Sequence, residues 1–322
     1  MTHLCASRSD LCSVSALFSI VLPVFAVIGL GYWVKRRAWL SDQAENDFSW
    51  WVYYVAVPPL LFLAMAQTPA TVLIQWRFLA AYVAGTVVLW GLIAMIARPW
   101  VQGFESRWLL GLGGTFSNSV YLGIPLVQTA FGGQGTQWVV LIALASNLLF
   151  VAGTAVVLGA RQRARASSVL LDTLKNPLLM AIALGLLFSA SGFQIPIGIE
   201  RLLSVLAQAA APVALFALGL TLGGTAIGLN TLPGRVWGLT AAKLFAHPAL
   251  VALGCWCLAV PALQAQVAIL VAALPAGALA HLMAQRFGYQ ASAVASAVMM
   301  GTVFSLLTLT LLLSLGVFTE LQ

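Results

Sequence analysis

The stretch WLLGLGGTFSNSVYLGIPLVQTAF, which runs from Trp108 to Phe131, decides the fold. It is long and apolar enough to cross a membrane as a helix, because about 20 residues span the hydrocarbon core. It also contains four glycines and Pro125. Proline removes a backbone donor and clashes with the preceding helical turn, and glycine adds backbone freedom. The stretch therefore predicts a membrane helix that opens near Gly123.

A second stretch repeats this pattern. The run VAILVAALPAGALAHLMAQ begins at Val267 and carries Pro275 and Gly277 within apolar sequence. Unwound backbone at membrane depth is tolerated only where it is buried in protein or lines a cavity. Two matching breaks therefore predict one shared cavity, in which half-helix amino ends near Leu126 and Ala276 offer N–H groups and positive dipole ends to an anion. Two ordinary kinked helices are the alternative.

The composition places both stretches in an integral membrane protein. Of the 322 residues, 61% are hydrophobic and 7% are charged, whereas a soluble domain has about 25% charged residues. Eight acidic and fifteen basic side chains cannot cover a soluble core of this size. The basic residues occur in short clusters between apolar runs rather than along one face, which argues against nucleic-acid binding.

Ten apolar runs are predicted to cross the bilayer as helices, since an open segment can satisfy its backbone there only as a helix. They cover residues 14–34, 48–66, 78–97, 108–131, 138–160, 176–192, 205–222, 237–260, 265–284 and 291–316. Lys and Arg accumulate in cytoplasmic loops. Eleven of these residues follow odd-numbered runs and three lie on the opposite side. Both termini are therefore expected outside the cytoplasm.

The two halves share prolines, glycines and phenylalanines at a constant spacing. Pairs separated by 154 positions are Pro23 and Pro177, Gly31 and Gly185, Pro58 and Pro212, and Phe62 and Phe216. Repetition at a fixed offset indicates a duplicated unit. Because each unit has an odd number of spans, the second enters the membrane upside down relative to the first. We expect a leader at 1–13, repeats at 14–160 and 176–316, a cytoplasmic linker at 161–175 and a tail at 317–322.

Polar side chains gather around the two predicted breaks. An unsatisfied polar group is costly in an apolar span, so these groups either bind a ligand or bond to another helix. The candidate substrate-binding residues are Asn118, Ser119, Tyr121, Gly123, Pro125, Pro275, Gly277 and His281.

Two basic side chains in the spans have open roles. His281 follows Pro275 by six residues. It could relay protons or remain neutral and bond to a neighbour. Lys243 lies inside the run that begins near Trp237. It could snorkel to the cytoplasmic interface or attract an anion from that side.

The acidic residues all lie in predicted loops or tails, so no span carries a carboxylate. This removes the buried Asp of a cation exchanger and of an intramembrane aspartyl protease. No nucleophile with a nearby base and no metal-ligand cluster can be placed either. The sequence therefore predicts neither an enzyme nor a cofactor.

Four segments together resemble the auxin efflux carrier family: SNSVYLGIPL from Ser117, KNPLLMAIALGLL from Lys175, APVALFALGLTL from Ala211 and KLFAHPAL from Lys243. The resemblance covers residues 14–316. It implies an all-α, ten-helix fold of the bile acid symporter and sodium/proton antiporter type, with a scaffold domain and a transport domain in which broken helices 4 and 9 cross. Asn118 matches the family's first crossover motif, whereas Leu279 stands where relatives often have an Asn.

The resemblance also implies a secondary carrier of small organic anions such as carboxylates, working by alternating access in a bacterial inner membrane. A sodium- or proton-coupled symporter of neutral or amphipathic compounds is one alternative, and a membrane sensor that has lost transport is another. Expected partners are the organic anion, the lipid bilayer, a possible H⁺ or Na⁺ and a possible second copy of the chain.

Overall fold

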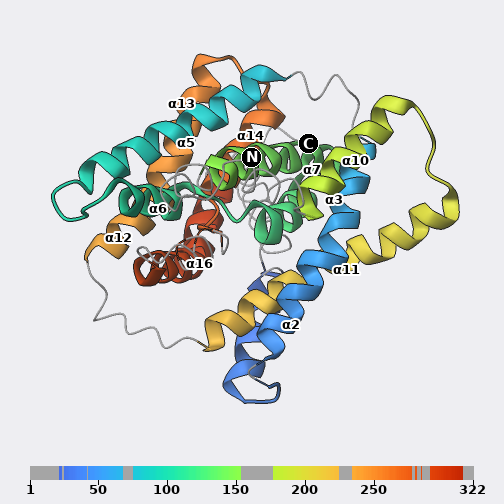
Figure 1. Cartoon of the computed structure of the whole chain (residues 1–322), viewed down its shortest axis with the longest axis horizontal. Coiled ribbons are helices and arrows are strands. Elements are labelled where there is room, and N and C mark those ends of the chain that lie inside the picture. The colour runs from blue at the N-terminus through green and yellow to red at the C-terminus, as the bar shows by residue number, and fades with distance from the viewer. Residues whose placement is uncertain are drawn as a thin grey trace, which may run out of the picture.

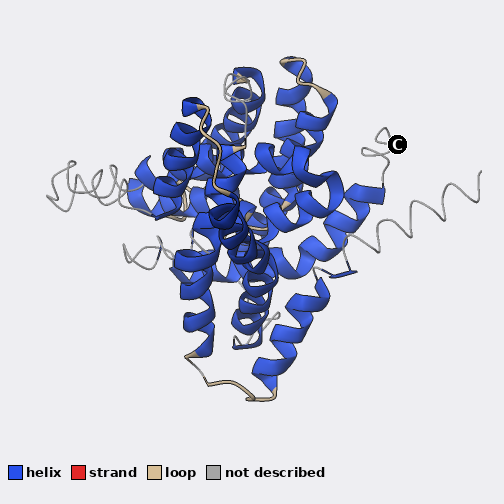
Figure 2. Cartoon of the chain, turned by 90° about the vertical axis from the view of Figure 1, so that its right-hand side faces the viewer, coloured by secondary structure: helices blue, strands red, loops and turns tan. Residues whose placement is uncertain are grey.

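The computed structural model describes residues 22–23, 25–41, 43–67, 75–153, 177–224, 234–277, 280, 284 and 291–314. Within them the chain is helical, and its one β-type pairing is an isolated bridge (Figure 2). Five described helices are long and apolar enough to cross a membrane: Ala44–Ala66, Trp76–Ile96, Ile197–Gly224, Gly234–Cys257 and Ala293–Leu312. An all-helical membrane protein is thus confirmed, while the ten-span count stays a prediction.

The helices separate into two groups in Figure 1. The panel group packs together α2 (Ala44–Trp51), the π-helical η1 (Val52–Ala56), α3 (Val57–Ala66), α10 (Pro177–Ser191) and α11 (Ile197–Gly224). The crossing group packs together α5 (Trp76–Ile96), α6 (Phe104–Thr115), α12 (Gly234–Ala241), the π-helical η5 (Ala242–Ala246), α13 (His247–Cys257), α14 (Ala262–Ala273) and α16 (Ala291–Ser314).

Two further elements join these groups. The π-helical η2 (Ser119–Gly123) runs into α7 (Ile124–Ser146), which continues into the π-helical η3 (Asn147–Ala152). The panel group reaches the crossing group through contacts of α3 with α7 and of α11 with η2. Gly132 has a φ of 64° and kinks α7, between the predicted spans 108–131 and 138–160. The chain turns there between one span and the next.

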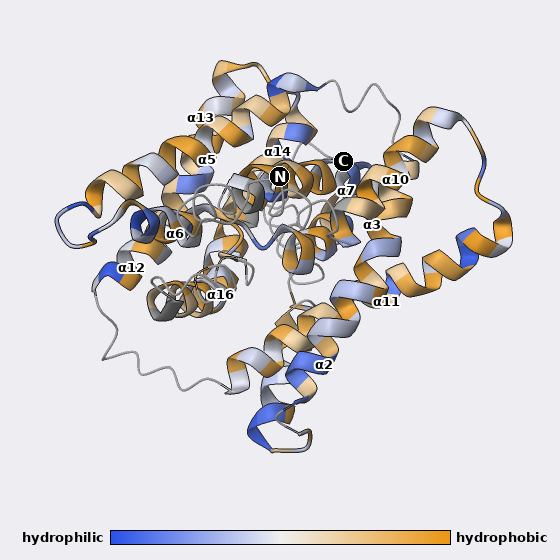
Figure 3. Cartoon of the chain, viewed as in Figure 1, coloured by the Kyte–Doolittle hydropathy of each residue, from blue (hydrophilic) through white to orange (hydrophobic). Residues whose placement is uncertain are grey.

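The outer surfaces of the helices are apolar, as a bilayer requires. On α5 the exposed side chains include Val88 and Met95, and Trp76 at its start is 62% exposed. Trp100, just past its end, is 64% exposed. Tryptophan favours the boundary between lipid and water, so the two indoles mark the ends of this span. Figure 3 shows the apolar residues along α5 and the hydrophilic residues at the turn before α2.

The panel group contains two reciprocal close contacts. A Cβ at Gly31, in the helix over 25–36, would collide with the carbonyl oxygen of Phe216 in α11. A Cβ at Gly185, in α10, would lie 2.6 Å from the carbonyl oxygen of Phe62 in α3. Gly31 pairs with Gly185, and Phe62 with Phe216, at the 154-residue offset. Each glycine therefore packs on the phenylalanine of the other half.

The π-helical segments η1, η2 and η5 are each followed by an α-helix whose first turn contains a proline. These prolines are Pro58, Pro125 and Pro248. A proline has no N–H and crowds the carbonyl four residues earlier. One widened turn relieves that crowding, so the helix continues instead of ending.

Candidate functional site

The two broken helices meet through their unwound backbones. Between α6 and η2 the break covers Phe116–Asn118, and after α14 it covers Leu274–Gly277. The Asn118 amide donates to the Pro275 carbonyl over 2.9 Å, and the Gly277 amide donates to the Phe116 carbonyl over 2.8 Å. The two segments form an antiparallel bridge between Ser117 and Ala276. Each break thus satisfies the backbone groups of the other in the buried interior.

The position of the first break differs from the predicted one. Gly123 has helical dihedral angles, φ −67° and ψ −49°, and Pro125 lies in the first turn of α7. The π-helical turn accommodates Pro125, so the chain opens earlier, at Phe116. In the second break Leu274 is extended, with ψ 152°, as the residue before a proline prefers. Pro275 therefore lies in a break after the end of α14, whereas Pro125 lies in the first turn of α7, which continues from η2.

The predicted glycines lie on either side of the crossing. A Cβ at Gly123 would be 2.8 Å from Leu274 Cδ1, and a Cβ at Gly277 would be 3.1 Å from the Phe116 ring. Each glycine lets the opposite break approach its backbone. Their role in the structure is therefore close packing of the crossing.

Lys243 reaches the crossing from η5. Its side chain is buried, with 2% of its surface exposed. The Nζ atom donates to Ser117 Oγ over 2.9 Å and to the carbonyl oxygen of Ala272, and it lies 2.9 Å from His247 Nδ1. Snorkelling to the interface was therefore the wrong interpretation, because the side chain points inward at the end of α14.

The hydrogen bonds assign the protons around Lys243. Thr86 Oγ1 donates to the Tyr82 carbonyl over 2.7 Å, so it accepts a proton from His247 Nε2 at 2.9 Å. His247 Nδ1 then carries no proton and accepts one from Lys243 Nζ. An ammonium group has three donors, and Nζ has three acceptors here. This arrangement accommodates a lysine ammonium beside a neutral histidine.

The ammonium also stabilises the break electrostatically. Ala272 lies in the last turn of α14, where unpaired carbonyl groups and the helix dipole create a negative end. Among the described residues, no carboxylate bonds to Lys243. A protonated Lys243 gives the crossing a net positive charge inside an apolar body.

Sequence reasoning placed Ser117 among the polar groups around the first break, but it missed three members of this network: Tyr82, Thr86 and His247. The Tyr82 hydroxyl lies 3.0 Å from Ser117 Oγ, and the His247 ring packs 5.7 Å from the Tyr82 ring between centroids. One signal was available. His247 follows Lys243 by four residues, so both side chains lie on one helical face.

The other predicted residues lie at the crossing or beside it. Asn118 and Ser119 are buried there, and among the described residues no hydrogen bond is made to the Asn118 side-chain amide. Tyr121 is half-buried in η2 and interacts electrostatically with Tyr53 of η1, in the panel group. His281 lies outside the described residues.

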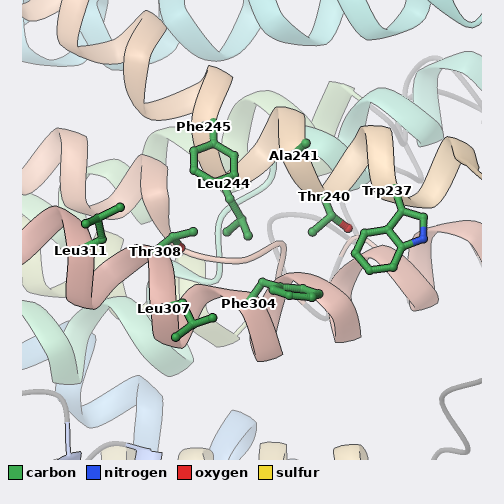
Figure 4. A pocket seen from close by; sticks show the side chains of 9 residues that line it. All are labelled: Trp237, Thr240, Ala241, Leu244, Phe245, Phe304, Leu307, Thr308 and Leu311. Carbon is green, nitrogen blue, oxygen red and sulfur yellow. The ribbon is translucent and has the colours of Figure 1, made fainter. Parts of the chain in front are cut away.

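A separate apolar groove runs between α12, η5 and α16 (Figure 4). It has a volume of about 340 Å³, and Trp237, Leu244, Phe304 and Leu311 are among the residues that line it. None of the predicted substrate-binding residues lines this groove. Its apolar walls suit a hydrocarbon chain and not a carboxylate.

Comparison with known proteins gives a consistent picture. A family model described as a membrane transport protein matches residues 16–166 and 159–313. A Rhizobium meliloti protein named "putative malonate transporter" is 29% identical, over 92% of this chain and 94% of the relative. An uncharacterized transporter of Methanothermobacter thermautotrophicus is 26% identical, over 90% of this chain and 95% of the relative. An uncharacterized transporter of Methanocaldococcus jannaschii is 24% identical, over 91% of this chain and 96% of the relative.

Proposed function

The chain belongs to the membrane transport protein family, of the auxin efflux carrier type that its sequence resembles, and from that premise we propose that it carries small organic anions. The family and the relatives are membrane transporters and not enzymes. The observation that carries the proposal is the buried ammonium of Lys243, which no described carboxylate neutralises. A cation held in an apolar interior favours an anionic guest.

The amino end of η2 adds to this field. The helix that follows the break, η2 continuing into α7, begins at Ser119, next to the crossing. Its positive dipole end points back toward the break. The half-buried Tyr121 and the side-chain amide of Asn118 supply hydrogen-bond donors nearby. In this proposal a carboxylate binds between these donors and Lys243.

Small dicarboxylates are the proposed substrate class. The relative from Rhizobium meliloti is named for malonate, and a dicarboxylate is small enough to bind beside a single ammonium. We propose transport by alternating access, in which the crossing group moves against the panel group. The few elements that join these groups, chiefly η2 and α7, are consistent with such a motion.

Ten spans in two inverted repeats are part of the same proposal. The exchanged contacts of Gly31 with Phe216 and of Gly185 with Phe62 support it, because a pseudo-twofold axis generates such contacts in pairs. We further propose an inner-membrane location with both termini outside the cytoplasm. Cysteine accessibility of single substitutions near each terminus, with a membrane-impermeant maleimide on intact cells, tests the orientation. The chain is a multi-pass membrane protein in either case.

Uptake of radiolabelled malonate into proteoliposomes tests the proposed function. We expect saturable uptake that succinate and malate reduce by competition. In Lys243→Met the initial rate should fall about tenfold or more, since the loss of ~1.4 kcal/mol of binding is tenfold. Arg235→Gln, at the exposed start of α12, is the matched control and should retain the rate. Malonate uptake that is unchanged in Lys243→Met would contradict the assignment of the site.

A further inference from the structure

The contact between Lys243 and His247 has a consequence for ion coupling. Lys243 Nζ and His247 Nδ1 are 2.9 Å apart, and both side chains are buried, with His247 fully inaccessible. We call these two side chains the proton pair. The hydrogen bonds of the site accommodate one positive charge on this pair, with a lysine ammonium that donates to a neutral histidine. A second charge at this distance is strongly disfavoured in an apolar interior unless an anion accompanies it.

The surroundings of the proton pair contain few groups that could compensate a second charge. α5 contributes Tyr82 and Thr86, the first break contributes Ser117, and α14 contributes a backbone carbonyl. α14 and α16 carry no titratable side chain.

The charged side chains on the other neighbouring elements are more distant. α12 carries Arg235 in its first turn, and α6 carries Glu105 and Arg107 at its start. Glu105 and Arg107 are ten or more residues before Ser117, which is about 15 Å along a helix. On α13, Cys255 lies eight residues after the histidine of the pair. The described residues therefore leave the guest anion as the partner for a second charge.

We propose that this carrier is a proton symporter in which His247 takes up one proton when a carboxylate occupies the crossing. The inference rests on the proposed anion transport and names its coupling ion. It assigns the coupling to His247, which the described structure places in the site, and not to His281.

Proton uptake and release both occur at His247 Nδ1. A proton from water on the entry side binds His247 Nδ1, and the hydrogen bond from Lys243 Nζ to that nitrogen breaks. The freed N–H of the ammonium turns to a carboxylate oxygen of the guest, and the imidazolium keeps its bond to Thr86 Oγ1. When the guest leaves on the other side, Nδ1 releases the proton to water and the bond between the two side chains forms again.

Proteoliposomes that contain the full chain, radiolabelled malonate and a pH-sensitive dye in the lumen test this proposal. The membrane potential is clamped with valinomycin and potassium. Malonate entry should acidify the lumen. An inward gradient of one pH unit should drive accumulation up to about tenfold, the limit for one proton per substrate. Malonate uptake without acidification would overturn the proton coupling and leave the proposed anion carrier intact. No uptake of malonate or of related dicarboxylates would overturn both.

Substitutions assign the coupling to His247. His247→Gln keeps an acceptor for Lys243 and a donor for Thr86 but cannot take up a proton. It should lose the tenfold accumulation driven by the pH gradient, and any malonate that it still moves should enter without acidifying the lumen. His3→Gln, in the leader, is the matched control and should accumulate malonate like the natural chain. Accumulation by His247→Gln at the natural level would overturn the assignment. If His247→Gln moves no malonate, accumulation is measured in His247→Asn instead. Accumulation at the natural level in that variant would overturn the assignment.

Discussion

At the scale of single residues, the crossing depends on complete hydrogen bonding around one buried charge. Lys243 uses all three donors, and His247 links it to Thr86 on α5. A buried charge is costly unless its hydrogen bonds are satisfied. The network therefore fixes the position of η5 against α14 and α5 as well as the charge of the site.

Removing one partner of this network should destabilise the protein more than removing both. In His247→Leu one donor of the Lys243 ammonium loses its acceptor, and an unpaired buried donor costs about 1–3 kcal/mol. We expect a lower thermal unfolding midpoint for this variant in detergent micelles. The double variant Lys243→Met with His247→Leu should recover part of the loss. A double variant that loses the full sum of the two single effects would show that the two side chains act independently.

The sequence identified Lys243 as notable but did not show its direction. A lysine near the start of an apolar run is compatible both with snorkelling and with burial. Its direction depends on where α14 ends, 30 residues further along the chain at Ala273. Asn118 was found because a polar residue next to a glycine-rich break is visible in one segment. His247 was missed because its partner Thr86, on α5, is 161 residues earlier in the chain.

At the scale of elements, the two prolines singled out in the sequence have different roles. Pro275 lies inside a break and forces Leu274 into extended backbone, whereas Pro125 follows a π-helical turn and belongs to the first turn of α7. Both were predicted to open a helix. Proline chemistry alone does not distinguish these outcomes, because a helix can either end before a proline or widen by one turn. The hydrogen bond from the Asn118 amide to the Pro275 carbonyl favours an ended helix at Pro275 only.

Substitution of each proline by alanine should separate the two roles. Pro275→Ala supplies an N–H that can extend α14 through Leu274, which competes with the bridge to Ser117. We expect malonate uptake to fall about tenfold, for a loss of ~1.4 kcal/mol in the crossing. Pro125→Ala should change uptake by less than about threefold, since a good helix former in the first turn of α7 costs little. Equal losses in the two variants would show that both prolines shape the site.

At the scale of the whole molecule, η2 and α7 join the panel group to the crossing group. α3 contacts α7, and α11 contacts η2. Five of the predicted spans and the repeated glycines could be predicted from sequence, because hydropathy and residue spacing are read directly from the chain. The division into two groups was expected only from the family resemblance, because the residues alone do not show which apolar faces pack together. Gly185 shows this: its repeat partner is visible in the sequence, but its contact with Phe62 is visible only in the fold.

A cross-link between the two groups should stop transport if one group moves against the other. Tyr53 of η1, in the panel group, interacts electrostatically with Tyr121 of η2, which joins the two groups. Tyr53→Cys with Tyr121→Cys, in a background without the four natural cysteines, therefore places two thiols at this junction. A short bis-thiol reagent that a reductant can cleave should lower malonate uptake by about tenfold or more, and reduction should restore it. Phe62→Cys with Phe188→Cys is the matched control, because these rings pack within the panel group, 5.8 Å apart between centroids. The control should transport equally well with and without the cross-link. Full transport by the cross-linked Tyr53 and Tyr121 variant would mean that this junction stays fixed, and alternating access would then require a motion within the crossing group itself.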